Sequence, residues 1–153
     1  MKILLDTTYF LPIIGVSIEN LPDDIIIRIL SKGYEVYMSE ITLFELSAKA
    51  AKYVIANKLP ITRVMKGFKV LMFDNRIHRV PLSHLKIISL ALELRRLLPD
   101  YIDALIVSSA LLFTNLLLTE DNDILTLNTH FEFKRIVDRL NKGFMIKSYR
   151  EIK

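Results

Sequence analysis

Residues 2–8 read Lys-Ile-Leu-Leu-Asp-Thr-Thr, and the interpretation of the whole chain starts from this stretch. Residues 3–5 are all apolar, without the polar alternation of a half-exposed strand, so they predict a buried strand. Asp6 follows this strand directly. A carboxylate in that position costs free energy unless it is paired, hydrogen-bonded or bound to a metal ion. Asp6 is therefore the first candidate for a functional residue.

Short apolar strands alternate with helical segments along the rest of the chain. Strands are predicted at residues 2–5, 35–38, 77–80, 116–118 and 144–148, and helices at 22–30, 42–57, 61–73, 83–97, 101–114 and 129–140. This alternation predicts an α/β fold with a central, mainly parallel sheet that helices cover on both faces. The chain has 153 residues and contains no repeat and no Gly/Ser linker, so we expect a single domain over residues 1–153.

Composition excludes several classes of protein. The chain contains no cysteine, which excludes disulfides, thiolate metal sites and cysteine nucleophiles. The most hydrophobic stretch, residues 104–118, includes four polar side chains and is shorter than a membrane span requires. The N-terminus enters a strand pattern without a signal-peptide core. We therefore expect a cytoplasmic protein with no membrane partner.

Positive charge is unevenly distributed along the chain, whose net charge is +4. Residues 49–79 contain eight basic side chains and one acid, and residues 134–153 contain seven basic side chains and two acids. Clustered positive charge of this kind suits a polyanion such as nucleic acid. The alternative for either stretch alone is a solvated helix face.

Four acids are expected at one rim of the predicted sheet. Sites in parallel α/β folds form beyond the carboxyl ends of the strands, and each acid follows a strand or starts a helix near that edge. The four are Asp6, Glu45, Asp103 and Asp121, with Asp123 as an alternative to Asp121. Carboxylates gathered in this way repel one another unless a cation lies between them. Oxygen ligands without Cys or an ordered His set favour Mg²⁺ or Mn²⁺.

Each acid also has a purely structural interpretation. Glu45 would complete a capping box with Thr42 at the start of its helix. Asp103 would stabilise the first turn of a helix that Asp100 caps. The acids of residues 121–123 would cap a turn. These roles explain the acids singly, but they do not explain why all four should share one rim.

In order and spacing, these segments resemble the motifs of PIN-domain ribonucleases, and among them the small VapC toxins of toxin–antitoxin pairs. The matching segments are Leu4-Leu5-Asp6-Thr7-Thr8, Ser39 through Glu45, Asp103-Ala104-Leu105-Ile106 with Ser108, Ser109 and Ala110, and Thr119-Glu120-Asp121-Asn122-Asp123-Ile124. The resemblance covers nearly the whole chain. The sequence departs from the family at Ile124, where members often carry Phe, and we expect this difference to affect packing more than chemistry.

The resemblance implies a PIN-like three-layer α/β/α fold and metal-dependent endoribonuclease activity. It implies Asp6, Glu45, Asp103 and Asp121 as catalytic and metal-binding residues for Mg²⁺ or Mn²⁺, with Asp123 as a substitute for Asp121. It also implies RNA as the substrate, an antitoxin protein as a partner and a homodimer. The first expectation for a subunit interface is the apolar helical surface at residues 64–72.

Four further residues are assigned supporting roles. The hydroxyls of Thr8 and Thr119 would orient water or carboxylates. Lys49 and Lys52 share a helical face with Glu45 and would hold the RNA backbone as it approaches the metal ions. The structural alternative for Lys49 is an i,i+4 pair with Glu45 on a solvated helix.

Other functions stay open at this point. A PIN domain of this kind could instead mature RNA or cleave DNA flaps, although the chain has no added zinc or helical-arch module for the latter. A non-catalytic PIN-like subunit would bind RNA or a partner without cutting. A phosphotransfer domain with Asp6 as nucleophile is disfavoured, because Thr7 and Thr8 follow it where a second acid is usual.

Overall fold

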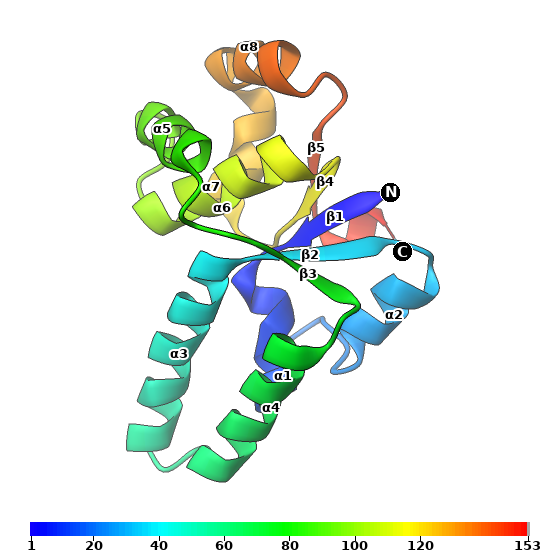
Figure 1. The fold of residues 1–153 in the computed structure, drawn as a ribbon, viewed down its shortest axis with the longest axis vertical. Coiled ribbons are helices and arrows are strands. Elements are labelled where there is room, and N and C mark those ends of the chain that lie inside the picture. Colours follow the sequence, from blue (N-terminus) through cyan, green and yellow to red (C-terminus); the bar gives the residue numbers. More distant parts are fainter. Residues whose placement is uncertain (153) are drawn as a thin grey trace.

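A five-stranded parallel sheet lies at the centre of the molecule (Figure 1). The structure is a computed structural model and describes residues 1–152. The strands are β1 (Lys2–Leu5), β2 (Glu35–Ser39), β3 (Ile77–Val80), β4 (Leu116–Leu118) and β5 (Met145–Lys147). They are ordered β3-β2-β1-β4-β5, and every neighbouring pair is parallel. The predicted α/β fold with a parallel sheet is confirmed.

Helices connect the strands and cover the sheet. They are α1 (Leu11–Ile14), α2 (Ile25–Ser31), α3 (Glu40–Ile55), α4 (Ile61–Phe73), α5 (Leu85–Leu94), α6 (Tyr101–Phe113), α7 (Asn122–Thr126) and α8 (Phe131–Leu140). Three short 3₁₀ helices are η1 (Thr7–Phe10), η2 (Leu127–Thr129) and η3 (Tyr149–Glu151). The six predicted helices are present, although α5 is shorter than expected. The one-turn elements α1 and η1 and the short helix α7 were not predicted.

The strands alternate between two cores, which is what makes the fold three-layered. Ile3 and Leu5 of β1 belong to the core beneath α1, α2, α3 and α4, whereas Leu4 between them belongs to the core beneath α5, α6 and α8. Leu117 faces the second core in the same way. Figure 1 shows the two groups of helices on opposite sides of the sheet. Because both faces are buried, the strands need no polar alternation.

Helices α3 and α4 extend away from the sheet as a pair, and α4 is anchored on α1 (Figure 1). The contact depends on Gly67, where an added Cβ would lie 2.6 Å from the Ile13 carbonyl oxygen and 2.8 Å from Ile14 Cα. Both neighbours are backbone atoms that cannot move aside cheaply.

No helix within residues 1–152 has the length and apolar character needed to cross a membrane.

Candidate active site

Asp6 directly follows β1 and is buried, with 6% of its surface exposed. Its Oδ1 accepts a 2.6 Å hydrogen bond from the Thr7 N–H, and its Oδ2 accepts a 2.7 Å bond from the Thr119 hydroxyl. Burial raises the pKa of Asp6 to about 6, although both hydrogen bonds oppose this shift. The carboxylate is therefore held in place by neutral donors, and its charge is not balanced by an ion pair among the described residues.

Glu45 lies in the second turn of α3, not in the first turn as predicted. The helix begins at Glu40 with Ser39 as its N-cap, so Thr42 is inside the helix and the predicted capping box is wrong. The Glu45 carboxylate instead accepts a hydrogen bond from the Thr7 hydroxyl and forms a 2.8 Å ion pair with Lys49. Thr7, rather than the predicted Thr8, makes the contact with a candidate carboxylate. Glu45 thus has no capping role that would account for its position.

Asp103 lies in the first turn of α6, as predicted. Asp100 caps this helix by accepting a 2.6 Å hydrogen bond from the Ile102 N–H, which confirms the predicted cap. The pKa of Asp103 is raised to about 7, first by burial and then by nearby negative charges. Those charges belong to Asp121, Asp100, Asp6 and Glu45, in that order. The other three predicted acids therefore all lie within electrostatic reach of Asp103.

Asp121 is the N-cap of the short helix α7. Its Oδ1 accepts hydrogen bonds of 2.7 Å from the Asp123 N–H and 3.3 Å from the Ile124 N–H. The capping interpretation is therefore correct for this residue, but capping does not exclude a second role. Asp121 and Asp123 are both exposed, but Asp121 contributes the strongest charge effect on the pKa of Asp103. These observations favour Asp121 over Asp123 as the fourth acid.

The oxygen donors at this rim fit a hard divalent cation in chemistry. In the part of the chain that the structure describes, however, no three Asp, Glu or His side chains converge closely enough to hold a metal ion. Other partners of the acids explain this arrangement, because Glu45 forms an ion pair with Lys49 and Asp121 accepts the capping hydrogen bonds of α7. Without a cation, mutual repulsion also favours separated carboxylates.

The predicted RNA-binding lysines line a cavity of about 350 Å³ beside Glu45. Lys49, Lys52 and Lys58 supply three ammonium groups, and Tyr53 supplies an aromatic ring. Lys49 alone of these is in an ion pair among residues 1–152. Both interpretations of Lys49 are therefore compatible with its position, since it pairs with Glu45 and also faces a basic cavity.

Two features at this rim were missed from the sequence. Thr7 contacts Glu45 across 38 residues. Glu120, which follows β4, accepts hydrogen bonds from η1 and from η3. The Tyr9 hydroxyl donates a 2.5 Å bond to Glu120, and the Tyr149 N–H donates a 2.8 Å bond to the same oxygen. Burial and the Glu120 carboxylate raise the pKa of Tyr9 above its usual range. Tyr9 stands in an apolar run, so no local pattern marked it as a partner of Glu120.

Comparison with known proteins agrees with this geometry. A family model described as PIN domain matches residues 3–128. No curated protein sequence matches the chain. Among solved structures, a chain of "Crystal structure of VapBC2 from Rickettsia felis bound to a DNA fragment from their promoter" is similar, with a TM-score of 0.56 and 19% identity over 97% of this chain and 98% of that chain. At this identity the likeness concerns the fold.

The family model covers the segments that carry Asp6, Glu45, Asp103 and Asp121. It also covers the first four strands of the sheet and the helices between them. Because the match extends over most of the sequence, the chain belongs to the PIN-domain family, whose members are nucleases that generally use divalent metal ions.

Proposed function

We propose that this protein is a metal-dependent endoribonuclease and the toxin of a toxin–antitoxin pair. The observation that carries the proposal is the electrostatic coupling of Asp103 to Asp121, Asp6 and Glu45 at the carboxyl edge of the sheet. Acids that raise the pKa of a neighbouring carboxyl in this way destabilise the folded protein unless a cation lies between them. The membership of the PIN-domain family supplies the class of reaction, which is phosphodiester hydrolysis.

The four acids would hold one or two Mg²⁺ or Mn²⁺ ions. When bound, such an ion polarises a phosphodiester and lowers the pKa of a water molecule. The protein's own part is positioning: Thr119 and the Thr7 N–H fix the Asp6 carboxylate, and the Thr7 hydroxyl fixes Glu45. Thr8 is partly buried in η1 and would at most act on water.

The basic cavity beside Glu45 supports RNA as the substrate. Lys52 and Lys58 have no ion-pair partner among residues 1–152, so both are free to contact phosphates. Tyr53 lies between them in sequence and offers a ring on which a base could stack. Residues 49–79 carry a net charge of +7, from eight basic residues and one acid, which extends the attraction along α3 and α4.

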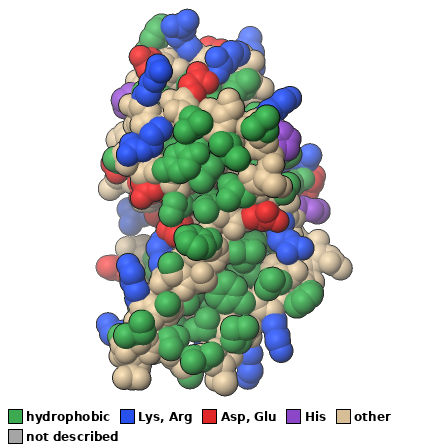
Figure 2. All heavy atoms as spheres, turned by 60° about the vertical axis from the view of Figure 1, so that its left-hand side comes forward, with side chains coloured by type: hydrophobic (Ala, Val, Ile, Leu, Met, Phe, Trp, Pro, Cys, Tyr) green, Lys and Arg blue, Asp and Glu red, His purple; other side chains and the backbone are tan. Residues whose placement is uncertain are grey.

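An apolar groove between α3 and α4 supports a protein partner. It has a volume of about 450 Å³ and is lined by side chains of both helices, among them Val54, Ile55, Val64, Met65 and Phe68. Figure 2 shows hydrophobic side chains gathered over this end of the molecule. Contiguous exposed apolar surface of this kind marks protein interfaces. We propose that an apolar segment of the antitoxin fills the groove.

A homodimer remains part of the proposal, and in it a second copy of the chain would occupy this groove when the antitoxin is absent. The residues predicted for its interface, 64–72, form one wall of the same groove, and Met65 and Met72 are about half exposed. Light scattering on the purified protein, with and without a co-expressed partner, would separate a dimer from a toxin–antitoxin complex. A monomer in both states would contradict this part of the proposal.

Cleavage of labelled single-stranded RNA tests the nuclease directly. We expect cutting with Mg²⁺ or Mn²⁺, none with EDTA, and a loss of at least about a hundredfold in Asp6→Asn and Asp103→Asn. Asp138→Asn is the matched control, because it removes an exposed acid from α8. If the wild type and both site variants cut equally well, the assignment of the acids is wrong.

The second candidate is a PIN-like subunit that binds RNA or a partner without cutting it. It is favoured by one observation, namely that no three of the described acids converge closely enough for a metal ion. RNA maturation by a PIN nuclease is the other alternative and would use the same site. A protein that binds RNA but cuts nothing under either metal would favour the binding subunit, whereas specific trimming of a precursor would favour maturation.

A further inference from the structure

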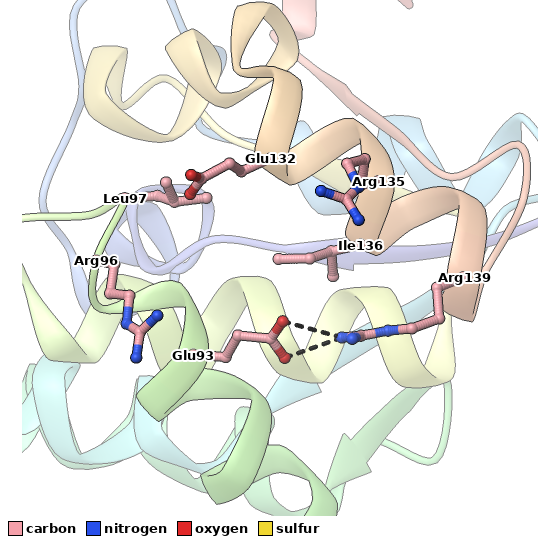
Figure 3. A pocket seen from close by; sticks show the side chains of 7 residues that line it. All are labelled: Glu93, Arg96, Leu97, Glu132, Arg135, Ile136 and Arg139. Atoms are coloured by element: carbon pink, nitrogen blue, oxygen red, sulfur yellow. Dashed lines mark hydrogen bonds and ion pairs between the residues drawn. The ribbon is translucent and has the colours of Figure 1, made fainter.

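A second basic pocket lies between α5 and α8, on the side of the sheet opposite α3 and α4 (Figure 1). Its volume is about 410 Å³. Figure 3 shows its lining, which combines three guanidiniums, two carboxylates and two apolar side chains. These residues are Glu93, Arg96, Leu97, Glu132, Arg135, Ile136 and Arg139. None of them belongs to the candidate active site.

The charges in this pocket are incompletely balanced. Arg139 donates two hydrogen bonds to Glu93, at 3.1 Å to Oε1 and 2.9 Å to Oε2, so these two neutralise each other. Arg96 and Arg135 form no ion pair with any residue in 1–152. Figure 3 shows the Glu132 side chain extending toward Leu97 rather than toward Arg135. Two guanidiniums therefore border the cavity without an ion-pair partner among residues 1–152.

Apolar side chains line the pocket, and an aromatic ring lies beside one of its guanidiniums. Leu97 and Ile136 line it, and Arg135 lies 6.0 Å above the ring centroid of Phe131. That ring is 74% exposed, so one of its faces is open to a ligand. Guanidinium groups bind phosphate through a planar fork, and aromatic rings stack on bases. A nucleotide unit combines both requirements.

We propose that the pocket between α5 and α8 is an exosite for single-stranded RNA, with Arg96 and Arg135 on phosphates and Phe131 beneath a base. The proposal rests on RNA being the substrate of the acidic site. Arg96 lies in the link between α5 and α6, and the first turn of α6 carries Asp103, so the pocket and the acids adjoin the same connection. An acidic protein segment would satisfy the guanidiniums, but it has no base to place on the exposed ring.

Binding of a fluorescein-labelled, roughly 12-nucleotide single-stranded RNA, followed by anisotropy in EDTA at several salt concentrations, tests the exosite. We expect Arg96→Gln/Arg135→Gln to bind about tenfold more weakly and to lower the salt slope by about 1.4, from two lost phosphate contacts. Lys2→Gln/Lys32→Gln removes two exposed charges outside both basic stretches and is the control. Glu132→Gln removes a negative charge from the pocket and should tighten binding about twofold, a gain that misfolding does not produce.

Each outcome decides the matter. If the wild type binds RNA and the pocket double variant matches it in affinity and salt slope, the exosite is wrong while the nuclease proposal stands. An equal loss in the control variant would reduce the effect to net charge and also overturn the exosite. Weakened binding of a poly-glutamate peptide with unchanged RNA binding would assign the pocket to a protein. A wild type that binds no RNA would overturn the exosite and the proposed substrate together.

Discussion

Thr119 Oγ1 lies 2.7 Å from Asp6 Oδ2 and joins the carboxyl ends of β4 and β1. The same hydroxyl accepts a 3.0 Å hydrogen bond from the Asp121 N–H. One buried side chain therefore donates to the first candidate ligand and accepts from the backbone of the fourth. This double contact links two acids that follow different strands, β1 and β4.

Replacing Thr119 by Val keeps the side-chain volume and removes both hydrogen bonds. Asp6 would lose a donor and the Asp121 N–H an acceptor, which should lower the free energy of unfolding by about 1–3 kcal/mol. Loss of an orienting partner should weaken Mn²⁺ binding by about ten- to a hundredfold. Urea unfolding and calorimetric Mn²⁺ titration measure the two effects. Thr119→Ser restores the hydroxyl, so equal behaviour of the Ser and Val variants would contradict the positioning role.

The raised pKa of Asp103 predicts how the stability of the metal-free protein depends on pH. Its pKa rises from 3.8 to about 7 on folding, so between these values the folded state binds more protons than the unfolded state. Stability from this group is therefore lost as pH rises from about 4 to about 7. We expect the free energy of unfolding of Asp103→Asn at pH 8 to exceed that of the wild type by on the order of 1 kcal/mol after solvent screening. The variant should therefore unfold at a higher temperature.

At pH 5 the difference between the two proteins should be clearly smaller than at pH 8, because the wild-type carboxyl is then protonated in the folded state and ionised only in the unfolded state, so only part of the loss has occurred. Thermal unfolding in EDTA at both pH values measures this, and every other titrating group cancels in the comparison. Adding Mn²⁺ at pH 8 should reverse the order, since only the wild type retains the full set of acids. A variant that is less stable than the wild type at pH 8 without metal would contradict the repulsion argument.

The strands were predictable because strands buried on both faces consist of uninterrupted apolar residues. Residues 3–5 and 116–118 are uniformly apolar, and both segments are buried in the sheet. Helix α4 was predictable from its periodicity despite its strand-like residues. The one-turn helix α1 was not, because four residues are too few to show a helical period.

The site was only partly predictable, because its hydrogen bonds join distant segments. Positions at the carboxyl edge identified the acids, but the Thr7 contact with Glu45 depends on how η1 packs against α3. The predicted capping box is wrong because Ser39 is both the last residue of β2 and the N-cap of α3. Thr42 presents an equally good capping signal three residues later, and local sequence does not distinguish the two.

RNA binding distinguishes the two roles considered for Lys49 and Lys52, which are contact with RNA phosphates and a purely structural role on the surface of α3. The Lys49–Glu45 pair is partly exposed and should contribute only a few tenths of a kcal/mol, so Lys49→Gln should leave stability nearly unchanged. If both lysines contact phosphates, each Gln variant should bind RNA a few-fold more weakly and lower the salt slope by about 0.7. Lys142→Gln, an exposed lysine after α8, is the control. Wild-type RNA affinity in both variants would leave only the surface ion pair.

Asp121 and Asp123 can be distinguished because Asn caps helices as well as Asp does. Asp121→Asn keeps an oxygen for the N–H groups of Asp123 and Ile124, so α7 and the free energy of unfolding should be preserved. The variant loses a carboxylate charge next to Asp103, and we expect RNA cleavage and Mn²⁺ binding to fall at least tenfold.

Asp123→Asn removes an equal charge two residues away, from an exposed side chain in the first turn of α7, and should cut RNA nearly as well as the wild type. Asp121→Ala loses both cap and charge, and should cost a further 0.5–2 kcal/mol or so of stability. Comparing unfolding and cleavage across the three variants separates the cap from the ligand. Full activity in Asp121→Asn combined with a loss in Asp123→Asn would reverse the assignment, because the carboxylate that the reaction needs would then be the one that does not cap α7.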